Sequence, residues 1–302
     1  MATRQYSIIS ARWQLGVYCA LMLVSLVWGC AVTPKKLTVK ELSQSFEADT
    51  IISTKTGKPI SFEELIAELI ESRVIYVGEQ HTDQTHHDIQ LKIIEAVFAK
   101  TPNMAVGMEM FDRSYQSVLD QWSEGLLDEK TFLRKTHWYA NWRYDYALYR
   151  NILNFIKDNR IRLVALNIPN CIPPKIREGG VDSLSAEDKK YLPKQIDTSN
   201  SAHREYLLKT FKAHQKFFKG SVEFEDYYMA QCVWEDAMAE AIAENLNGDV
   251  MVVLAGNGHI QYKYGIPDRA FRRTHADFRT VYLAGVGGEI DLAIADFIWV
   301  TN

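Results

Sequence analysis

The chain has 302 residues, of which 47% are hydrophobic and 24% are charged, and its formal net charge is −4 at pH 7. This composition is typical of a globular protein with a large core and excludes a disordered or low-complexity chain. Without residues 1–29 the chain keeps 32 basic and 38 acidic residues, a net charge of −6. Since neither charge is concentrated in long runs, we expect no nucleic-acid partner.

The first thirty residues have the pattern of a secretory signal. Two arginines precede an uncharged apolar stretch, Leu15 to Val27, which is short for a membrane span, since about 20 apolar residues are needed. The stretch leads to Gly29 and Cys30, an end that resembles the lipobox of bacterial lipoproteins. We predict a signal peptide over 1–29, acylation of Cys30, for example by palmitate, and a lipid anchor in a bacterial envelope. Ala31 favours the outer membrane, and an uncleaved anchor or ordinary secretion are the alternatives.

The segments that follow alternate between strand and helix patterns. Residues 30–50 are largely polar and predict a tether. Ser61, with Glu64 three residues later, predicts the capped start of a helix. Apolar runs rich in β-branched residues predict buried strands at 51–52, 74–77, 104–108, 162–167, 250–255, 281–286 and 297–300. Helical periodicity predicts helices at 86–99, 111–122, 128–136 and 144–159.

This alternation breaks between residues 171 and 246. The segment begins rich in Pro, Gly, Asp and Ser, and then has the pattern of two amphipathic helices broken near Gly220. We therefore predict an α/β fold with a mostly parallel sheet flanked by helices, in residues 51–170 and 247–302, and a smaller all-helical insertion at 171–246. Cys171 and Cys232 form one disulfide or remain two buried thiols.

Two Gly-x-x-His tetrapeptides each follow one of these apolar runs. They are Gly78 to His81 and Gly256 to His259, and a third run ends in Glu109. Ligand sites in parallel sheets collect beyond the carboxyl ends of the strands, and glycine permits the tight turn and close backbone approach that such a site needs. We therefore expect His81, Glu109 and His259 to share one cleft.

Two kinds of chemistry suit these residues. Two imidazoles and a carboxylate are ligands for a divalent metal that activates water, and they equally suit a metal-free acid/base pair in which Glu109 orients one histidine. Glu79 and Arg143 are further candidates. The structural alternative is that each histidine only completes a turn at a strand end. His86 and His87, after Asp83, are interpreted as a solvated helix start.

Aromatic residues are dense in two places. One is the tract from His137 to Tyr149, which forms core packing or lines a cleft where Arg143 binds an anion or pairs with Glu109. The other is the insertion, whose aromatic helices either pack on the sheet or enclose a porphyrin, because a tyrosine phenolate is a known axial ligand of haem iron.

Six segments resemble the ChaN family of haem-binding lipoproteins, in the same order along nearly all of the chain after Cys30. They are Val74–His81, Gly107–Phe111, Trp138–Tyr149, Leu163–Pro169, Trp234–Ala239 and Ala255–His259. The resemblance implies a lipoprotein of iron and haem acquisition that binds ferric haem through a tyrosine, forms a homodimer around two stacked haems and delivers haem to an outer-membrane receptor.

For the haem site, the resemblance directs attention to the insertion. Tyr227, Tyr228 and Tyr206 are the candidate ligands, in that order, with His214 as a neighbour of the phenolate. The same resemblance extends to the Tiki, TraB and erythromycin esterase proteins, which share the two Gly-x-x-His turns. It implies, as the alternative function, an envelope hydrolase that uses His81, Glu109 and His259 to bind a metal or as acid and base.

Overall fold

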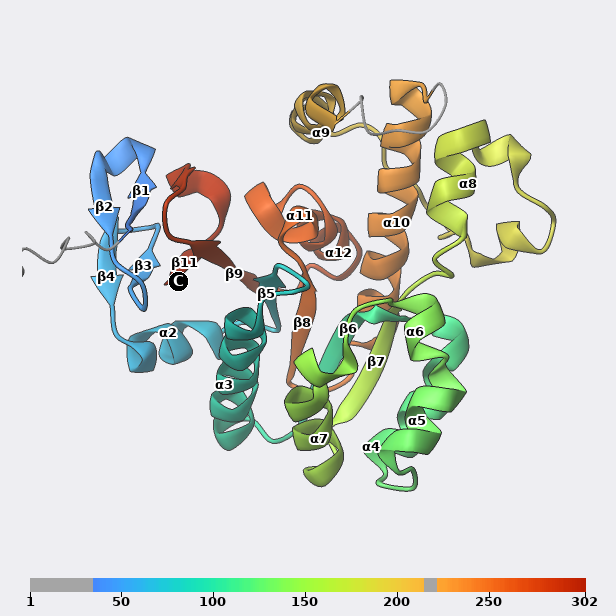
Figure 1. The fold of residues 1–302 in the computed structure, drawn as a ribbon, viewed down its shortest axis with the longest axis horizontal. Coiled ribbons are helices and arrows are strands. Elements are labelled where there is room, and N and C mark those ends of the chain that lie inside the picture. Colours follow the sequence, from blue (N-terminus) through green and yellow to red (C-terminus); the bar gives the residue numbers. More distant parts are fainter. Residues whose placement is uncertain (1–34, 215–221) are drawn as a thin grey trace, which may run out of the picture. The chain divides into compact units, whose positions relative to one another are not determined.

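Eight strands form the central sheet of the computed structural model, which describes residues 35–214 and 222–302 (Figure 1). The predicted signal peptide, Cys30 and the break near Gly220 lie outside these residues. Within them, no helix is both long and apolar enough to cross a lipid bilayer.

The central sheet is mainly parallel, as predicted. Across the sheet the order is β4 (Lys58–Ile60), β3 (Ile51–Ser53), β11 (Phe297–Thr301), β9 (Phe278–Gly285), β5 (Val74–Glu79), β8 (Val250–Gly256), β6 (Met104–Asp112) and β7 (Arg162–Asn167). All neighbours from β11 to β7 pair in parallel, whereas β3 pairs antiparallel with both β11 and β4. Each predicted strand is present.

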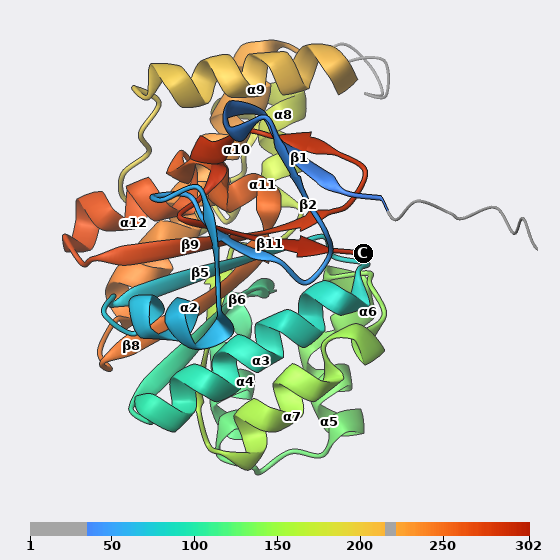
Figure 2. The same ribbon diagram turned by 90° about the vertical axis from the view of Figure 1, so that its left-hand side faces the viewer.

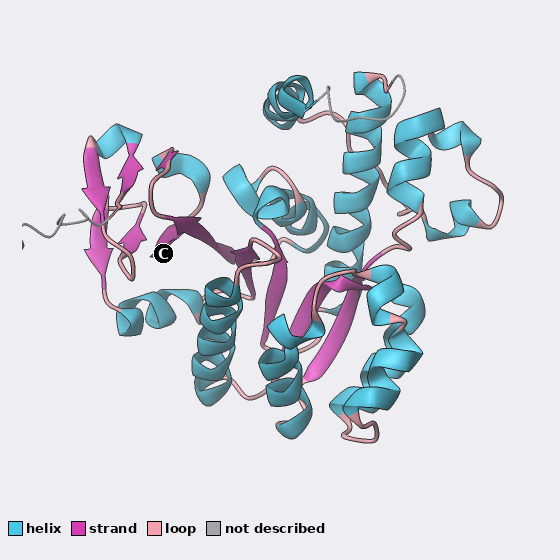
Figure 3. Cartoon of the chain, in the orientation of Figure 1, coloured by secondary structure: helices cyan, strands magenta, loops and turns pink. Residues whose placement is uncertain are grey.

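Helices cover both faces of this sheet (Figure 3). The alternation of side chains along β5 decides what each face packs against: Ile75 and Val77 belong to one buried cluster, Val74 and Tyr76 to another. The first cluster includes residues of α2 (Phe62–Leu69), α3 (Gln84–Lys100), α4 (Gln116–Ser123), α5 (Glu129–Thr136), α6 (Trp138–Asn141) and α7 (Arg150–Asp158). The second includes residues of α10 (Phe224–Asn245), α11 (Asn257–Ile260) and α12 (Ile266–Thr274).

Helix starts follow the predicted chemistry. Ser61 accepts a hydrogen bond from the Glu64 amide while the Glu64 carboxylate accepts one from the Ser61 amide, so a capping box begins α2. Asp83 accepts from the Thr85 amide at the start of α3.

Between β7 and β8 the described residues contain helices and loops but no strand. They form α8 (Ile172–Gly179), the 3₁₀ turns η4 (Val181–Ser183) and η5 (Asp188–Tyr191), α9 (Ser201–His214) and α10. Helix α10 packs against α8, α12 and β7, and α9 lies across the same side of the molecule (Figure 2). Residues 36–302 therefore form one compact unit, in which the insertion is joined to the sheet through α10.

The prediction of a tether over residues 30–50 is wrong for residues 37–46. There β1 (Leu37–Val39) and β2 (Gln44–Phe46) form a small sheet with β10 (Glu289–Ile290), and their buried apolar side chains pack against Ile52 and Ile298. The strands have only three residues each, too few for an alternating pattern to be recognised in a polar segment.

The two cysteines within the described residues are both free, so no disulfide joins them. Cys171 is exposed at the start of α8, whereas Cys232 is buried in α10, where an Arg269 guanidinium nitrogen lies 3.2 Å from its sulfur. Neither sequence alternative describes this arrangement completely.

Candidate functional site

The carboxyl edge of the parallel strands brings the two Gly-x-x-His turns and Glu109 together. Glu79 is the last residue of β5, Glu109 lies near the end of β6, and Gly256 ends β8 directly before α11, which carries His259. Because β5, β8 and β6 are neighbours in the sheet, these strand ends are adjacent. The predicted cleft residues are thus side by side.

Glu109 lies at the centre of the site and is buried. Its Oε2 accepts a hydrogen bond of 2.7 Å from the Gly256 amide, and its Oε1 lies 3.4 Å from Nε2 of His259. Burial alone would raise the pKa of Glu109, but His259, His81 and the amide together hold it below the ordinary value. Glu109 is therefore a carboxylate at neutral pH.

His259 lies between two buried carboxylates. Its Nε2 faces Glu109, and its Nδ1 lies 3.3 Å from Oε1 of Glu235 on α10. Burial opposes a charged imidazole, but the two carboxylates outweigh it and raise the pKa of His259 to about 10. A carboxylate at each ring nitrogen favours the imidazolium form of His259, and the side-chain nitrogen of Gln231 also lies 3.2 Å from Nδ1.

His81 is held by a third buried carboxylate, that of Glu79. Its Nδ1 lies 2.7 Å from Oε1 of Glu79, which also accepts from the Tyr149 hydroxyl at 2.6 Å, while Oε2 accepts from the Gln90 amide at 2.9 Å. Burial would raise the pKa of Glu79, but His81 and His87 lower it to about 2. Burial would lower the pKa of His81, but Glu79 and Glu109 raise it above the ordinary value.

The exposed edge of His81 faces the other turn. A Cβ atom on Gly256 would lie 3.0 Å from Cε1 and 3.2 Å from Nε2 of His81, and 3.6 Å from Oε2 of Glu109. Only glycine leaves that space open. The His81 side chain is 26% exposed, against 9% for His259 and 1% for Glu109, so solvent reaches the group mainly through His81.

A cleft of about 240 Å³ adjoins Glu109. Its walls come from the ends of β6 and β7, the segment from α6 to Arg143, the start of α8, and Trp234 of α10. Trp234 donates to Oδ1 of Asn167 at 2.7 Å and contacts the His259 ring at 4.9 Å between centroids. The aromatic tract therefore lines a cleft in part: Trp142 and Arg143 face it, whereas Trp138, Tyr146 and Tyr149 are buried in the core.

The side chains of this site do not form a metal centre as they stand. Across residues 35–214 and 222–302, no three or more His, Cys, Asp or Glu side chains are grouped to hold an ion. His81 and His259 direct their Nδ1 atoms at Glu79 and Glu235, and Glu109 is paired with His259. The geometry is that of alternating carboxylates and imidazoles, which suits proton transfer. The metal assignment remains a prediction.

The interpretation of His86 and His87 as a solvated helix start is wrong, because both are buried. The His86 Nδ1 accepts from the Gln80 amide at 2.8 Å, and the His87 Nδ1 lies 3.4 Å from Oε2 of Glu79. Through these contacts, the two histidines in the first turn of α3 stabilise the turn that carries His81.

The insertion places the three candidate tyrosines differently. Tyr228 is buried, and its hydroxyl lies within 3.1 Å and 3.4 Å of the carbonyl oxygens of Thr198 and Asn200. Tyr206 and Tyr227 are half-buried, and the hydroxyl of Tyr206 accepts a hydrogen bond from Gln261. The side chain of His214 lies outside the part of the chain that the structure describes.

Sequence reasoning missed three residues that build the site: Glu235, Tyr149 and Gln90. Glu235 and Gln90 lie in helices and Tyr149 directly precedes α7, and all three were grouped with amphipathic or aromatic packing. Glu235 could have been suspected, because Glu235 and Asp236 are adjacent acids in an otherwise apolar stretch of α10. Their burial requires a cation, which Arg269 supplies: its Nε lies 3.4 Å from Oε2 of Glu235, and its Nη1 contacts Oδ2 of Asp236.

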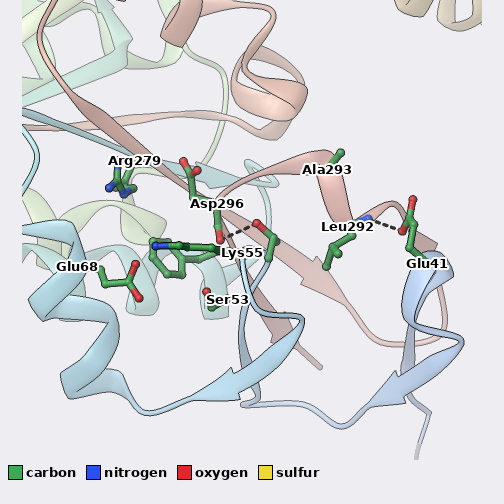
Figure 4. A pocket seen from close by; sticks show the side chains of 10 residues that line it. Glu41, Ser53, Lys55, Glu68, Arg279, Leu292, Ala293 and Asp296 are labelled. Atoms are coloured by element: carbon green, nitrogen blue, oxygen red, sulfur yellow. Dashed lines mark hydrogen bonds between the residues drawn. The ribbon is translucent and has the colours of Figure 1, made fainter.

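A second pocket, of about 560 Å³, lies at the antiparallel end of the sheet (Figure 4). Lys55, Glu68 and Arg279 are among its lining residues, and the Leu292 amide donates to Glu41 at its edge. None of the candidate residues from the sequence lines it, so the site at the carboxyl edge remains the candidate.

Comparison with known proteins gives a consistent result. The family model described as haem-binding uptake, Tiki superfamily, ChaN, matches residues 65–270. A solved structure described as cofacial heme binding to ChaN of Campylobacter jejuni shares the fold, with a TM-score of 0.68 and 22% identity, covering 82% of this chain and 95% of that one. An erythromycin esterase shows a weaker likeness, with a TM-score of 0.44 and 15% identity over 79% of this chain and 76% of that one.

A curated relative is the chloroplastic protein RETICULATA-RELATED 5 of Arabidopsis thaliana, 23% identical over 260 residues. The match covers 76% of this chain and 34% of that protein, so this chain spans about a third of the relative's length. The family match, by contrast, covers more than half of the chain and includes both Gly-x-x-His turns. The chain belongs to the ChaN family of haem-binding uptake proteins in the Tiki superfamily.

Proposed function

We propose that this protein binds ferric haem through a tyrosine of the helical insertion and takes part in haem acquisition. The observation that carries the proposal is membership of the haem-binding uptake family, supported by a fold shared with a Campylobacter jejuni protein described as binding heme cofacially. A phenolate is a hard ligand that favours the oxidised iron, which suits a protein that takes up haem and passes it on.

Haem is far too large for the cleft beside Glu109. That cleft has the liquid volume of about eight water molecules. We infer that the haem site lies on the insertion, where the ring of Tyr206 lies 5.6 Å from that of Tyr262.

Among the three candidates, Tyr228 has the weakest support, because iron would have to replace two carbonyl partners of a buried hydroxyl. Burial also raises the pKa of Tyr227 and of Tyr228, so each phenolate depends on the ferric ion for its stabilisation. Tyr206 and Tyr227 are half-buried and are tested first.

The experiment is a titration of the purified protein with ferric haem, followed by optical spectroscopy. A tyrosinate charge-transfer band is expected, and it should disappear in one of Tyr227→Phe, Tyr206→Phe or Tyr228→Phe. His81→Ala is the control and should keep the band. A band that survives all three tyrosine changes would refute the ligand assignment, and no haem binding at all would refute the function.

The finer parts of this proposal concern location and assembly. Cys30 carries a lipid that anchors the protein in the outer membrane of a bacterium, and two copies enclose two stacked haems before transfer to a receptor. Labelling with radioactive palmitate should be lost in Cys30→Ala. Sedimentation with and without haem should show a monomer becoming a dimer, and an unchanged mass would contradict the stacked arrangement.

A second function, hydrolysis at the carboxyl edge, is favoured by one observation: Glu109 is a buried carboxylate beside two histidines whose pKa values are raised. In this site Glu109 takes a proton from a water as the oxygen attacks an ester carbonyl. His81 donates its proton to the departing alkoxide, and His259 keeps Glu109 in position as the base. Glu109 then returns a proton to His81.

Hydrolysis is tested with an ester and peptide panel, alongside metal analysis of the purified protein. Glu109→Gln and His259→Ala should abolish turnover, whereas the exposed His275→Ala should not. Turnover that requires a stoichiometric divalent metal would favour the metal-dependent form, and no turnover on any substrate would refute this second function.

A further inference from the structure

We propose that the cleft beside Glu109 binds a small organic anion whose carboxylate is held by Arg143 and whose apolar part rests on Trp142 and Trp234. The position of this site follows from the acid/base site proposed above. The inference itself concerns binding and requires no turnover.

The conformation around Arg143 places its side chain at the cleft. Arg143 has φ +71°, a left-handed conformation that residues other than glycine rarely adopt. The rings on either side, Trp142 and Tyr144, both contact the His81 ring, at 4.8 and 5.1 Å between centroids. Trp142 and Tyr144 thus contact His81, whereas Arg143 between them is exposed and lines the cleft.

The guanidinium of Arg143 is free for a ligand. Within the part of the chain that the structure describes, it has no hydrogen bond and no ion pair, although Glu109 and Asp112 also line the cleft. Glu109 is instead paired with His259, and Oδ1 of Asp112 accepts from the amide and hydroxyl of Ser114. The expected pairing of Arg143 with Glu109 does not occur.

Most neutral polar groups of the cleft are already occupied. The side-chain amide of Asn167 donates to the Glu109 carbonyl and its oxygen accepts from Trp234 and the Ile168 amide. The Asn141 side chain donates to Tyr115 and to the Thr136 carbonyl. A ligand therefore finds one unpaired cation rather than an array of neutral hydrogen-bonding groups.

The rest of the cleft favours a compact, partly aromatic body. Met110, Ile168 and Pro174 join the two tryptophans on its wall. Of the two carboxylates that line the cleft, Glu109 faces His259 and Asp112 accepts from Ser114, so neither is paired with Arg143. A volume of about 240 Å³ fits a single ring with one charged substituent. Small aryl or short-chain carboxylates meet all of these requirements.

The test compares benzoate with benzamide, which has nearly the same shape but no charge. Isothermal titration calorimetry of the full protein without haem should show tighter binding of benzoate by about tenfold or more, since charge-assisted hydrogen bonds from arginine are the stronger kind. Arg143→Gln should remove the preference, and Arg143→Lys should keep part of it.

Arg160→Gln is the matched control. Arg160 is also exposed with a left-handed φ, +52°, but it precedes β7 and so lies at the opposite edge of the sheet. It should retain the full preference for benzoate. Should Arg143→Gln fail to fold, Arg143→Gly, which suits the left-handed backbone, replaces it.

Three outcomes overturn the inference: no binding of benzoate to the unchanged protein, equal binding of benzoate and benzamide, or a preference that survives in Arg143→Gln. Benzoate binding without any ester hydrolysis or haem spectrum would refute the functions proposed above but leave this inference standing. Turnover or a haem spectrum without benzoate binding would do the reverse.

Discussion

Replacement of His259 by glutamine should be one of the most damaging single changes to the stability of this protein. His259 is the shared cation between Glu109 and Glu235, both buried. Glutamine has a similar length but no charge, so in the variant Glu109 loses its ion-pair partner, whereas Glu235 keeps Arg269 as a counter-charge. Removal of one partner from a buried ion pair costs about 3–5 kcal/mol of the free energy of unfolding.

The raised pKa of His259 sets an upper limit on the same effect. A rise from 6.5 to about 10 means that folding tightens proton binding by at most about 5 kcal/mol. Because Glu109 and Glu235 also interact with other groups, the value measured for His259→Gln should be nearer 3 than 5 kcal/mol.

The pH dependence has a definite sign. The folded pKa of His259 lies above the unfolded one, so its stabilisation is complete below pH 6.5 and is lost as the pH rises toward about 10. In His259→Gln the pKa values of Glu109 and Glu235 should rise, since burial is no longer opposed by the imidazolium. Those carboxylates then protonate in mildly acidic solution, and the variant recovers part of its stability there.

The assay is urea unfolding at several pH values between 5 and 9, followed by tryptophan fluorescence. His275→Gln is the control, because His275 is exposed at the end of α12, and its effect should stay within about 0.5 kcal/mol. The reasoning fails if both variants lose similar stability at pH 7. It also fails if the gap between His259→Gln and the unchanged protein stays constant from pH 5 to pH 7.

Three further changes test the neighbouring contacts. Glu79→Gln should lower the pKa of His81, because the carboxylate at its Nδ1 is replaced by a neutral amide; NMR titration of the His81 ring would show the change, and an unchanged pKa would contradict it. Tyr149→Phe should cost about 1–3 kcal/mol in urea unfolding by removing a donor from the buried Glu79, whereas no loss would mean that other donors compensate. Gly78→Ala should lower the free energy of unfolding by about 1–3 kcal/mol, because the new Cβ would lie 2.0 Å from Oδ1 of Asn257. Gly258→Ala is the control: no atom lies within 4 Å of its new Cβ, so it should be neutral in the same assay.

The sheet and its polar edge could be predicted because the signal is local. Each buried strand is a continuous apolar run, and each functional turn begins with a glycine directly after such a run, as at Gly78 and Gly256. Once the strands are taken as parallel, the convergence of His81, Glu109 and His259 follows from topology. No contact between distant segments has to be known in advance.

The supporting groups could not be predicted, because their roles depend on which helix faces which strand end. Glu235 is about 24 residues from His259 in sequence, and nothing local marks it as a partner of that histidine. The same holds for His87, whose burial follows from the packing of α3 under the strand ends. Periodicity locates a helix but does not say what its polar positions meet.

Helix α10 links the two proposed functions of this chain. Tyr227, Gln231 and Glu235 are spaced four residues apart, so they lie along one face of α10, and Gln231 donates to Glu235 at 2.7 Å. Glu235 in turn contacts His259 at the cleft, and the pKa of Tyr227 is raised mainly by burial and further by Tyr206 and Glu235. An iron–phenolate bond at Tyr227 would therefore act on the same carboxylate that keeps His259 protonated. For this reason a variant of α10 is informative only when haem binding and the charge state of His259 are measured on the same sample.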